Sequence, residues 1–463
     1  MKKAISILLT CALVLSILAT GAYAGDSAKV NYTIINPYET VDWENSDTYK
    51  ACLHCHTSAS DGDVDLLPWL ELYYGLDYDI LAVTDHGVIN NGWNKDKKLN
   101  GIFCGFRSYE PLTEEQYNAI QTGTYPSETR TKKDRGMIDI TGGIECNMAV
   151  VSKTHVNGYW SNYGQGVWGT ENDYETAPKK IEELGGYSVL NHVGDWVNSN
   201  NFPARSHSAF YINYFANIFT KYKTCLGMEI INNTDNCTRA DRELWDELLS
   251  VVIPTGRNIW GFADDDSEAI SDVGRSFELF PLTENTEENV KNAMINGAFF
   301  AASKFQRNAL RENEITEGDG KVANVTNILC SDNEITVEFK DTCECEGNDE
   351  WTVEWISDGE IIKTSAVSTG TDTLSLNDYD GSLGCYVRFV IKNEKHGVVY
   401  SQAFELQYEG RENREIPASP IPDNIFGKIF WFWYQRLGTS LISLIVEKIM
   451  DWCGLLPVYG RMF

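Results

Sequence analysis

The sequence predicts an α/β protein: a closed or nearly closed α/β barrel, followed by a small antiparallel β-sandwich and an apolar amphipathic tail. Three observations predict this order. Short apolar segments alternate with amphipathic ones over residues 49–304, as in successive βα units. Residues 322–407 then alternate apolar and polar side chains with period two, which is typical of antiparallel strands. Residues 426–452 are dense in Trp, Phe, Leu and Ile.

The first 24 residues have the three zones of a secretory signal peptide. Lys2 and Lys3 precede an apolar run at 4–18, and Ala22-Tyr23-Ala24 forms a small-residue cleavage site. A retained membrane anchor is the weaker alternative, because the apolar run is short for a membrane span. We therefore expect an exported protein, either secreted or attached to the cell surface.

The barrel is expected over residues 25–315. Its predicted strands are 49–54, 79–84, 137–144, 187–191, 226–231 and 258–263. Its clearest predicted helices are 64–74, 174–184 and 238–252, and the last two repeat apolar residues at i, i+3 and i+4. Chemistry in such folds is found at the carboxyl ends of the strands.

The β-sandwich is expected over residues 322–408, with strands at 334–339, 351–355, 360–363 and 386–391. We interpret it as a structural or interaction module. A Pro-rich linker at 416–422 leads to the tail, 423–463, whose apolar stretches are interrupted by Lys428, Arg436, Glu447 and Lys448. Such a tail suits either a membrane surface or docking on protein.

Net charge bears on the binding of nucleic acid, and the cysteine count bears on disulfide pairing. The formal net charge of the 463 residues is −29, which repels the phosphate backbone of nucleic acids. Loss of the signal peptide would leave 11 of the 12 cysteines, an odd number that cannot pair completely within one chain. Cys330 with Cys385 is one conceivable disulfide among several.

Potential metal ligands stand at or just after the ends of the predicted strands. They are His54, His56, Asp61, Asp85, His86, Glu145, His192, Glu229, Asp264, Asp265, Asp266 and Glu268. His54 and His56 alternate onto one face of a strand, so both imidazoles can bind one ion. Burying so many carboxylates together without cations would be prohibitive, which indicates bound metal.

Five short segments that carry these residues resemble, in the same order, the sequence motifs of the polymerase and histidinol phosphatase (PHP) superfamily. Residues 54–62, HCHTSASDG, resemble its H-x-H-T-x-x-S-D-G opening, and residues 83–87, VTDHG, resemble its second motif. Residues 143–145, 190–192 and 227–229 look like the third, fourth and fifth. The resemblance covers about residues 49–303.

The last motif departs from the family pattern. Residues 260–268 followed by Gly274-Arg275 look like the D-D-x-H and G-R ending of the exported, stand-alone hydrolases of this superfamily. Asp266 then takes the ligand aspartate position, and Glu268 stands where histidine is usual. A carboxylate there shifts the metal preference towards Mn or Fe, and less typically Zn. In the alternative register, Asp264 is the ligand and Asp266 replaces the histidine.

The resemblance implies a distorted (β/α)7 TIM-like barrel that holds two or three divalent ions (Mn, Fe or Zn) and hydrolyses a phosphoester. The implied ligands are His54, His56, Asp61, His86, Glu145, His192, Asp266 and Glu268, with Glu145 bridging two ions. Glu145, His192, Asp85 and Arg275 are the candidate catalytic residues. Asp85 is a ligand or a support for one, Glu229 is a ligand or only orients a neighbour, and Arg275 contacts a substrate phosphate or forms an ordinary salt bridge.

Residues outside these motifs have plainer interpretations. Cys55 alternates away from the two histidines, so we expect it to pack in the barrel wall. His155 and His207 lie in aromatic, Asn-rich stretches that we interpret as long loops, with a surface role commoner than a functional one. Trp160 and Trp168 could form a substrate-stacking wall or pack within a loop.

The sequence thus favours a phosphoesterase that acts on a phosphorylated small molecule or surface-linked substrate, with water activated by divalent ions. Two alternatives remain. One is hydrolysis of a non-phosphate ester or carbamate bond. The other is a degenerate barrel that serves as a surface binding module, an idea supported only by Glu268.

Overall fold

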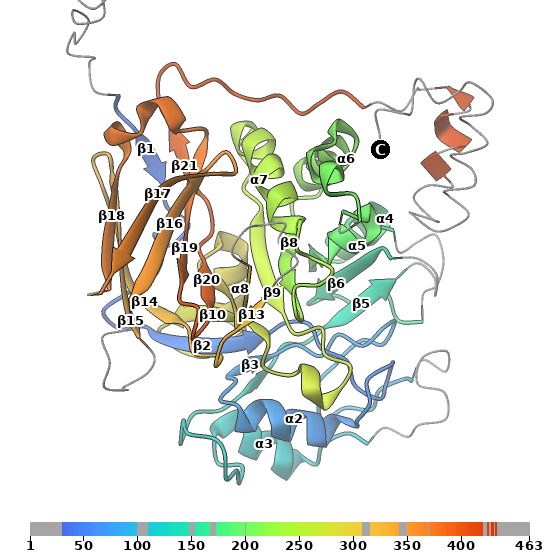
Figure 1. The fold of residues 1–463 in the computed structure, drawn as a ribbon. Helices are drawn as coiled ribbons and strands as arrows, with labels where there is room; N and C mark the ends of the chain where they lie inside the picture. The colour runs from blue at the N-terminus through green and yellow to red at the C-terminus, as the bar shows by residue number, and fades with distance from the viewer. Residues whose placement is uncertain are drawn as a thin grey trace, which may run out of the picture.

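The computed structural model describes residues 30–99, 110–147, 153–166, 173–199, 201–307, 315–341, 350–368, 370–419, 424–425, 427–429 and 431–432. These residues form a mixed α/β structure with several β-sheets, as predicted at this level (Figure 1). The expected signal peptide, Trp168 and most of the apolar tail lie outside the described residues. Within the described residues, no helix has the length and hydropathy needed to cross a membrane.

Three parallel strands begin the expected hydrolase region, residues 25–315. β2 (Asp47–Cys52), β3 (Ile80–Leu81) and β4 (Ile138–Asp139) pair in that order, with Ala51 opposite Ile80 and Ile80 opposite Ile138. Helix α2 (Leu66–Gly75) connects β2 to β3, and α3 (Glu114–Thr122) precedes β4. Helix α3 is fixed at its start by a capping box between Thr113 and Gln116.

A second sheet contains β5 (Ile144–Asn147), β6 (His155–Tyr159), β7 (Tyr187–Leu190), β8 (Cys225–Asn232) and β9 (Trp260–Asp264). The pairs β5–β6 and β6–β7 are antiparallel, whereas β7–β8 and β8–β9 are parallel. All eight residues of β8 are buried, as expected for a strand covered on both faces. The helices of this part are α4 (Thr176–Glu183), α5 (Val193–Val197), α6 (Ala209–Lys221) and α7 (Asp241–Val252).

Two isolated β-bridges join the ends of these two sheets. His86, beyond β3, bridges Glu145 of β5, and Cys55, beyond β2, bridges Ser267 beyond β9. Both bridges are parallel, and they bring the residues that follow β2, β3 and β9 together with the start of β5. The predicted ligands stand at these strand ends.

The first sheet continues into the C-terminal β region, residues 322–408. β10 (Ser276–Leu282) pairs with β2, β11 (Phe300–Ser303) pairs with β10, and β20 (Val398–Tyr400) pairs with β11, all antiparallel. β1 (Thr33–Ile35) pairs with β21 (Phe404–Gln407), so the N-terminal strand lies against the C-terminal β region. Helix α8 (Glu287–Asn296) lies between β10 and β11 in the chain.

The remaining strands and the 3-10 helices lie both in this region and before it. β16 (Trp351–Ser357) pairs with β17 (Glu360–Val367) and with β19 (Tyr386–Lys392), while β14 (Ala323–Ser331), β15 (Glu334–Asp341) and β18 (Thr371–Ser375) form a separate sheet. A two-stranded sheet joins β12 (Phe305–Gln306) and β13 (Thr316–Glu317). The 3-10 helices are η2 (Pro203–His207), η3 (Ile253–Thr255), η4 (Ile270–Asp272), η5 (Leu376–Asp378) and η6 (Asp380–Ser382).

The strands and helices that we named from periodicity are present, with ends shifted by a few residues. One strand prediction was wrong in part, because residues 137–144 contain the whole of the short strand β4 and only the first residue of β5. The interpretation of His155 and His207 as loop residues was also wrong. His155 begins strand β6, and His207 ends the 3-10 helix η2, just before α6.

Candidate metal centre

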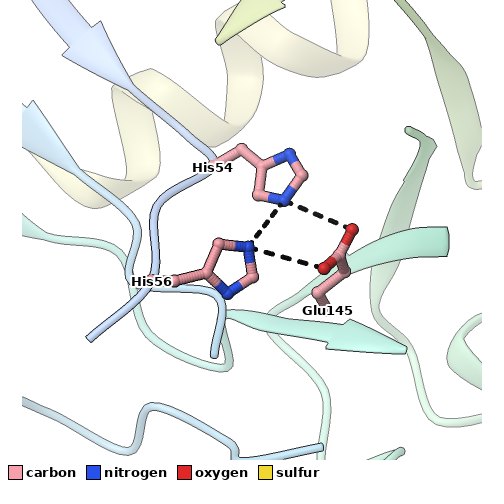
Figure 2. A group of neighbouring side chains, drawn as sticks. All are labelled: His54, His56 and Glu145. Atoms are coloured by element: carbon pink, nitrogen blue, oxygen red, sulfur yellow. Dashed lines mark hydrogen bonds and ion pairs between the residues drawn. The ribbon is translucent and has the colours of Figure 1, made fainter. Parts of the chain in front are cut away.

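His54 and His56 follow strand β2 and present their imidazoles to the same point. Their Nε2 atoms are 3.1 Å apart, and both side chains are almost completely buried (Figure 2). The bridge between Cys55 and Ser267 fixes the intervening backbone. Cys55 itself is fully buried in a hydrophobic cluster, which confirms its predicted place in the core.

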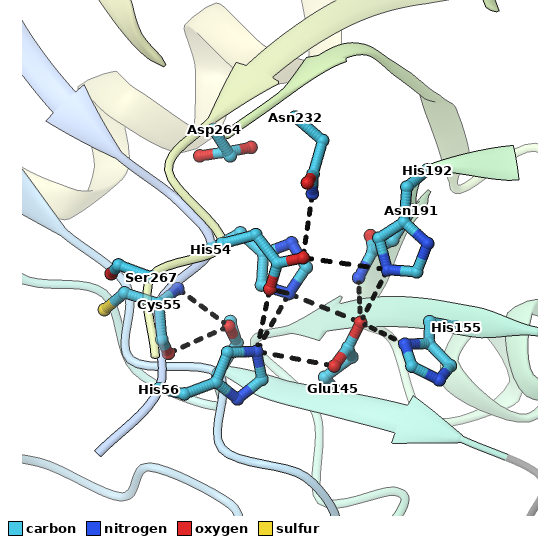
Figure 3. Close-up of polar contacts among 12 residues, drawn as sticks. His54, Cys55, His56, Glu145, His155, Asn191, His192, Asn232, Asp264 and Ser267 are labelled. Atoms are coloured by element: carbon cyan, nitrogen blue, oxygen red, sulfur yellow. Dashed lines mark hydrogen bonds and ion pairs between the residues drawn. The ribbon is translucent and has the colours of Figure 1, made fainter. Parts of the chain in front are cut away.

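Glu145, on strand β5, is the centre of the cluster. Its Oε1 lies 3.3 Å from His54 Nε2, and its Oε2 lies 3.5 Å from His56 Nε2 and 2.8 Å from His86 Nδ1. His155 and His192 also face it, with ring nitrogens 3.1 and 3.6 Å from Oε1 (Figure 3). Five of the seven histidines of the chain therefore surround one buried carboxylate.

Asp266, directly beyond strand β9, closes the cluster from the opposite side. Its Oδ1 lies 3.0 Å from His54 Nε2 and 3.1 Å from His56 Nε2. The neighbouring acids are used elsewhere. Asp264 accepts the Leu53 amide hydrogen at 2.6 Å, and Asp265 accepts backbone hydrogen bonds from residues 274–276. The geometry favours the register in which Asp266 is the ligand.

Asp61 and His86 form a second group beside the first. Asp61 Oδ2 is 3.2 Å from His86 Nε2, and Asp61 Oδ1 is 3.5 Å from His56 Nδ1. Three sets of side chains are compact enough to hold an ion: His54 with His56 and Glu145, His56 with Asp61 and His86, and His86 with Glu145 and His155. They share His56, His86 and Glu145, so neighbouring ions would have ligands in common.

Other polar side chains orient these groups. Glu229 Oε1 lies 2.6 Å from His54 Nδ1, which makes Nδ1 the donor and leaves Nε2 to face Glu145 and Asp266. Asn191 Nδ2 donates to Glu145 at 2.7 Å, and Asn232 Nδ2 donates to Asp266 at 3.0 Å (Figure 3). Glu229 thus has the orienting role that was one of its two predicted alternatives.

Asp85 lies behind the cluster. Its carboxylate accepts hydrogen bonds from the Thr57 amide and from the Ser60 hydroxyl, and it pairs with Lys97 Nζ at 3.0 Å. Because Thr57 and Ser60 belong to the turn that carries Asp61, Asp85 supports a ligand in this structure. Among the described residues, its hydrogen bonds and its ion pair go to Thr57, Ser60 and Lys97, and none goes to a histidine of the cluster.

Arg275 and Glu268 lie outside the cluster. The Arg275 guanidinium pairs with Asp272 at 2.9 Å and donates to Asn233, so the structure shows the salt-bridge alternative. Glu268 is exposed, and no ion pair joins its carboxylate to the histidines of the described residues. Of the eight predicted ligands, the structure therefore brings together all except Glu268.

His155 is the site residue that sequence reasoning underrated. It was set aside because its segment looked like a loop, yet it begins a strand that is antiparallel to β5 and places Asn147 opposite His155. A sequence pattern for this strand does exist, because residues 155–159, HVNGY, begin with alternating polar and apolar side chains. His207 and Trp160 lie outside the cluster: His207 pairs with Glu243 and Glu247, and the Trp160 indole donates to Glu287.

The electrostatics of the cluster suit bound cations. Burial lowers the pKa of His54, but Asp266, Glu145 and Glu229 more than offset this and raise that pKa well above its ordinary value. Burial raises the pKa of Glu145, yet the surrounding histidines hold it well below its usual range. The buried carboxylates are therefore stable only beside positive charge, which either protonated imidazoles or metal ions can provide.

The donor set fits divalent transition ions. Imidazole nitrogens and carboxylate oxygens suit Mn, Fe and Zn, and each of the five histidines that face Glu145 places a ring nitrogen within 3.6 Å of its carboxylate. His192 Nδ1 is buried and has no hydrogen-bond partner among the described residues, so this imidazole has capacity left for a ligand. Outer partners such as Glu229 and Asn191 are the kind that orient metal ligands.

Two solved structures resemble this chain at low sequence identity. No family model and no curated protein matches the sequence. A two-domain protein from Bacteroides vulgatus, described as containing a predicted PHP-like metal-dependent phosphoesterase, is 12% identical over 80% of this chain and 98% of that chain, with a TM-score of 0.40. The lesion-specific endonuclease PfuEndoQ from Pyrococcus furiosus is 11% identical over 90% and 89% of the two chains, with a TM-score of 0.31. At TM-scores below 0.5, neither likeness by itself establishes fold or activity.

Proposed function

We propose that this chain is an exported, metal-dependent phosphoesterase of the PHP superfamily. The observation that carries the proposal is the convergence of five imidazoles and the Asp61 and Asp266 carboxylates around the buried Glu145. The motifs that supply these side chains stand in the order that the superfamily has. In this proposal, the bridged sheets form a distorted (β/α)7 barrel, and residues 322–408 form a β-sandwich beside it.

The three ligand sets support two or three ions. His54, His56, Glu145 and Asp266 would hold one ion, Asp61, His56 and His86 a second, and His86, Glu145 and His155 a third. Such ions lower the pKa of a bound water and stabilise the attacking and leaving oxygens of an in-line displacement at phosphorus. Glu145 would be shared between ions, as the motif resemblance implies.

The surrounding residues would set the geometry of the reaction. Glu229 fixes the tautomer of His54, and Asn232 fixes the orientation of Asp266. Asp85 holds the turn at Thr57 and Ser60, so it would position Asp61 rather than contact the substrate. We therefore assign Asp85 a positioning role and Arg275 no direct contact with the phosphate.

Metal analysis and a substrate panel test this proposal. Protein purified without chelator should contain at least two equivalents of Mn, Fe or Zn, and it should hydrolyse p-nitrophenyl phosphate or bis-p-nitrophenyl phosphate. His56→Ala should abolish the activity, because His56 belongs to two ligand sets. His207→Ala is the matched control, since His207 is a partly exposed histidine that pairs with Glu243 and Glu247 instead.

Two outcomes would point to the alternatives. Hydrolysis of p-nitrophenyl acetate alone would make the protein a hydrolase of non-phosphate esters. Less than one equivalent of metal, with no activity after addition of Mn²⁺, Fe²⁺ or Zn²⁺, would indicate a binding module. Nucleic acid is not a proposed substrate, because the chain carries a net charge of −29.

The proposed substrate is a phosphorylated small molecule or a surface-linked phosphoester. The second becomes attractive if the apolar tail binds a membrane, since the protein would then work next to a lipid surface. Full-length protein should sediment with liposomes more than a version that lacks residues 426–463. Equal sedimentation of the two proteins would remove the membrane part of the proposal.

A further inference from the structure

Lys97 is a lysine in the interior, beside the candidate metal centre. Its side chain is 1% exposed, and its Nζ lies 3.0 Å from Oδ2 of Asp85, whose side chain is fully buried. The nearby lysines of the same segment face outward, since Lys95 is 57% exposed and Lys98 is also exposed. Lysine is rarely buried unless it is paired, and a buried ion pair gains little stability over apolar side chains. The pair between Lys97 and Asp85 therefore indicates a role other than stability.

The segment that carries Lys97 is attached to its surroundings. The carbonyl of Lys98 accepts a hydrogen bond from Gln165 Nε2 at 3.1 Å, and Gln165 Oε1 accepts the Ile89 amide hydrogen at 2.9 Å. A single side chain thus ties the residues just after Lys97 to those just after His86. The ammonium of Lys97 is therefore presented to Asp85 from a fixed backbone.

Asp85 connects Lys97 to the turn after β2. Its Oδ1 accepts hydrogen bonds from the Thr57 amide at 2.6 Å and from the Ser60 hydroxyl at 3.0 Å, while Oδ2 faces Lys97. The Thr57 hydroxyl also donates to Oδ2, at 2.9 Å. Because Lys97 balances its charge, the Asp85 carboxylate can be held in the interior by these donors without binding a metal ion itself.

Ser60 continues the line of contacts to two proposed ligands. Its side chain is fully buried, and its Oγ lies 3.1 Å from Asp61 Oδ1 and 3.3 Å from His56 Nδ1. On the opposite edge of the same ring, His56 Nε2 lies 3.1 Å from Asp266 Oδ1. A displacement of Ser60 would therefore disturb one carboxylate and one imidazole of the candidate metal centre.

We propose that Lys97 is a positioning residue of the metal centre. Its ammonium balances the Asp85 carboxylate, which in turn holds the turn at Ser60. Ser60 then fixes the directions of Asp61 and His56, so metal affinity depends on a lysine that contacts no ion. This inference rests on the proposed function, because it requires that the cluster binds metal.

Metal affinity of the full-length protein tests the proposal. Titration with Mn²⁺ and with Zn²⁺, each in competition with a chromophoric chelator, gives the affinity without any measurement of activity. Lys97→Met removes the ammonium but keeps an unbranched side chain, and it should weaken metal binding at least tenfold. Lys95→Met is the matched control, because it makes the same change two residues away at an exposed lysine, and it should bind metal as wild type does.

A double variant separates positioning from packing. Asp85→Asn combined with Lys97→Met removes both charges, while the amide oxygen can still accept the hydrogen bonds from Thr57 and Ser60. It should bind metal more tightly than Lys97→Met alone, because no uncompensated carboxylate is left in the interior. If Lys97 served only to fill space, the double variant would bind no better than the single one, and the proposal would be overturned.

Ser60→Ala provides a test that leaves the ion pair intact. It removes only the hydroxyl and should also weaken metal binding at least tenfold. Thermal unfolding of each variant controls for folding, and Ser60→Ala remains informative even if Lys97→Met does not fold. Metal affinity equal to that of wild type in folded Lys97→Met, or in folded Ser60→Ala, would overturn the proposal. Absence of metal binding by wild type would instead overturn the proposed function, and this inference with it.

Discussion

Individual side chains decide the chemistry of this molecule, and His155 shows how. Its ring nitrogen lies 3.1 Å from Glu145, closer than that of His192, although His192 stands in a recognisable motif and His155 does not. The position depends on an antiparallel strand pair that brings His155 opposite Asn147. A residue can therefore belong to the candidate metal centre without a sequence motif of its own.

Replacement of His155 by Ala should prevent the binding of one of the proposed ions. We expect the metal content to fall by about one equivalent and phosphoesterase activity to fall at least tenfold, because one of the three ligand sets loses a member. Metal analysis together with initial rates measures both effects. His207→Ala should change neither quantity, and equal metal content in the two variants would contradict a ligand role for His155.

Asp139 is a buried acid that should make stability depend on pH. Burial raises the pKa of Asp139 to about 7. The hydrogen bonds that its carboxylate accepts from the Asn90 side chain and the Trp93 amide act in the opposite direction and lower the pKa. The folded protein then holds a proton that the unfolded chain releases above its ordinary pKa, 3.8. Stability contributed by this group is therefore greatest at low pH and is lost as pH rises towards 7.

Asp139→Asn should remove this dependence. Between pH 5 and pH 7, the free energy of unfolding of wild type relative to the variant should fall with pH, by up to about 1.4 kcal/mol per pH unit. Above pH 8 the difference should stay constant, which serves as the internal control. Urea unfolding across this range measures it, and parallel curves for the two proteins would rule out the raised pKa.

At the scale of elements, the conformation of the turn after β2 determines where Asp61 lies in the candidate metal centre. This turn carries Thr57, Ser60 and Asp61, and it folds back so closely that Gly62 has no room for a side chain. A Cβ at Gly62 would lie 2.4 Å from the His56 carbonyl oxygen and 2.8 Å from the Thr57 carbonyl carbon. Backbone atoms cannot give way as a flexible side chain can, so glycine is required here.

Gly62→Ala should therefore displace Asp61 and weaken metal binding. We expect the protein to remain folded but to lose the ion held by Asp61 and His86, with activity reduced at least tenfold. Gly381→Ala is the matched control, because a Cβ there would meet nothing within 4 Å. Metal content and rates of both variants test the prediction, which fails if Gly62→Ala retains wild-type metal content.

Across the whole molecule, a buried ion pair joins the hydrolase region to the C-terminal β region. Asp246 of α7 accepts two hydrogen bonds from Arg388 and one from the Tyr386 hydroxyl, both on β19. All three side chains are at least 97% buried. Together with the β11–β20 pairing, this contact makes the two regions one continuous structure.

Asp246→Asn should uncouple the two regions, because it leaves the buried Arg388 without its counter-charge. We expect a loss of about 3–5 kcal/mol in the free energy of unfolding. Denaturant unfolding followed by tryptophan fluorescence measures this loss. Glu183→Gln, which breaks an exposed pair with Lys180, should leave the unfolding midpoint unchanged, and equal midpoints for the two variants would contradict the structural role of Asp246.

The sequence by itself determined the kind of site. Each candidate ligand apart from His155 stands at or after the end of a predicted strand, and periodicity locates strand ends because it reports local burial. The same periodicity located α2, α4 and α7 and most strands of the C-terminal β region. The carboxylates at the strand ends, such as Glu145 and Asp266, could be expected to converge because parallel strands end at a common edge.

Only the tertiary structure decided which of these side chains meet. Glu268 lies two residues after Asp266 in the sequence, but the chain turns outward and leaves its carboxylate exposed, while Asp266 contacts both histidines. His155 reaches the cluster through an antiparallel strand pair, and β1 joins the C-terminal β region by pairing with residues 370 to 374 positions away in the sequence. Local patterns report burial and strand ends, whereas the direction of a turn and the partner of a strand depend on contacts between distant segments.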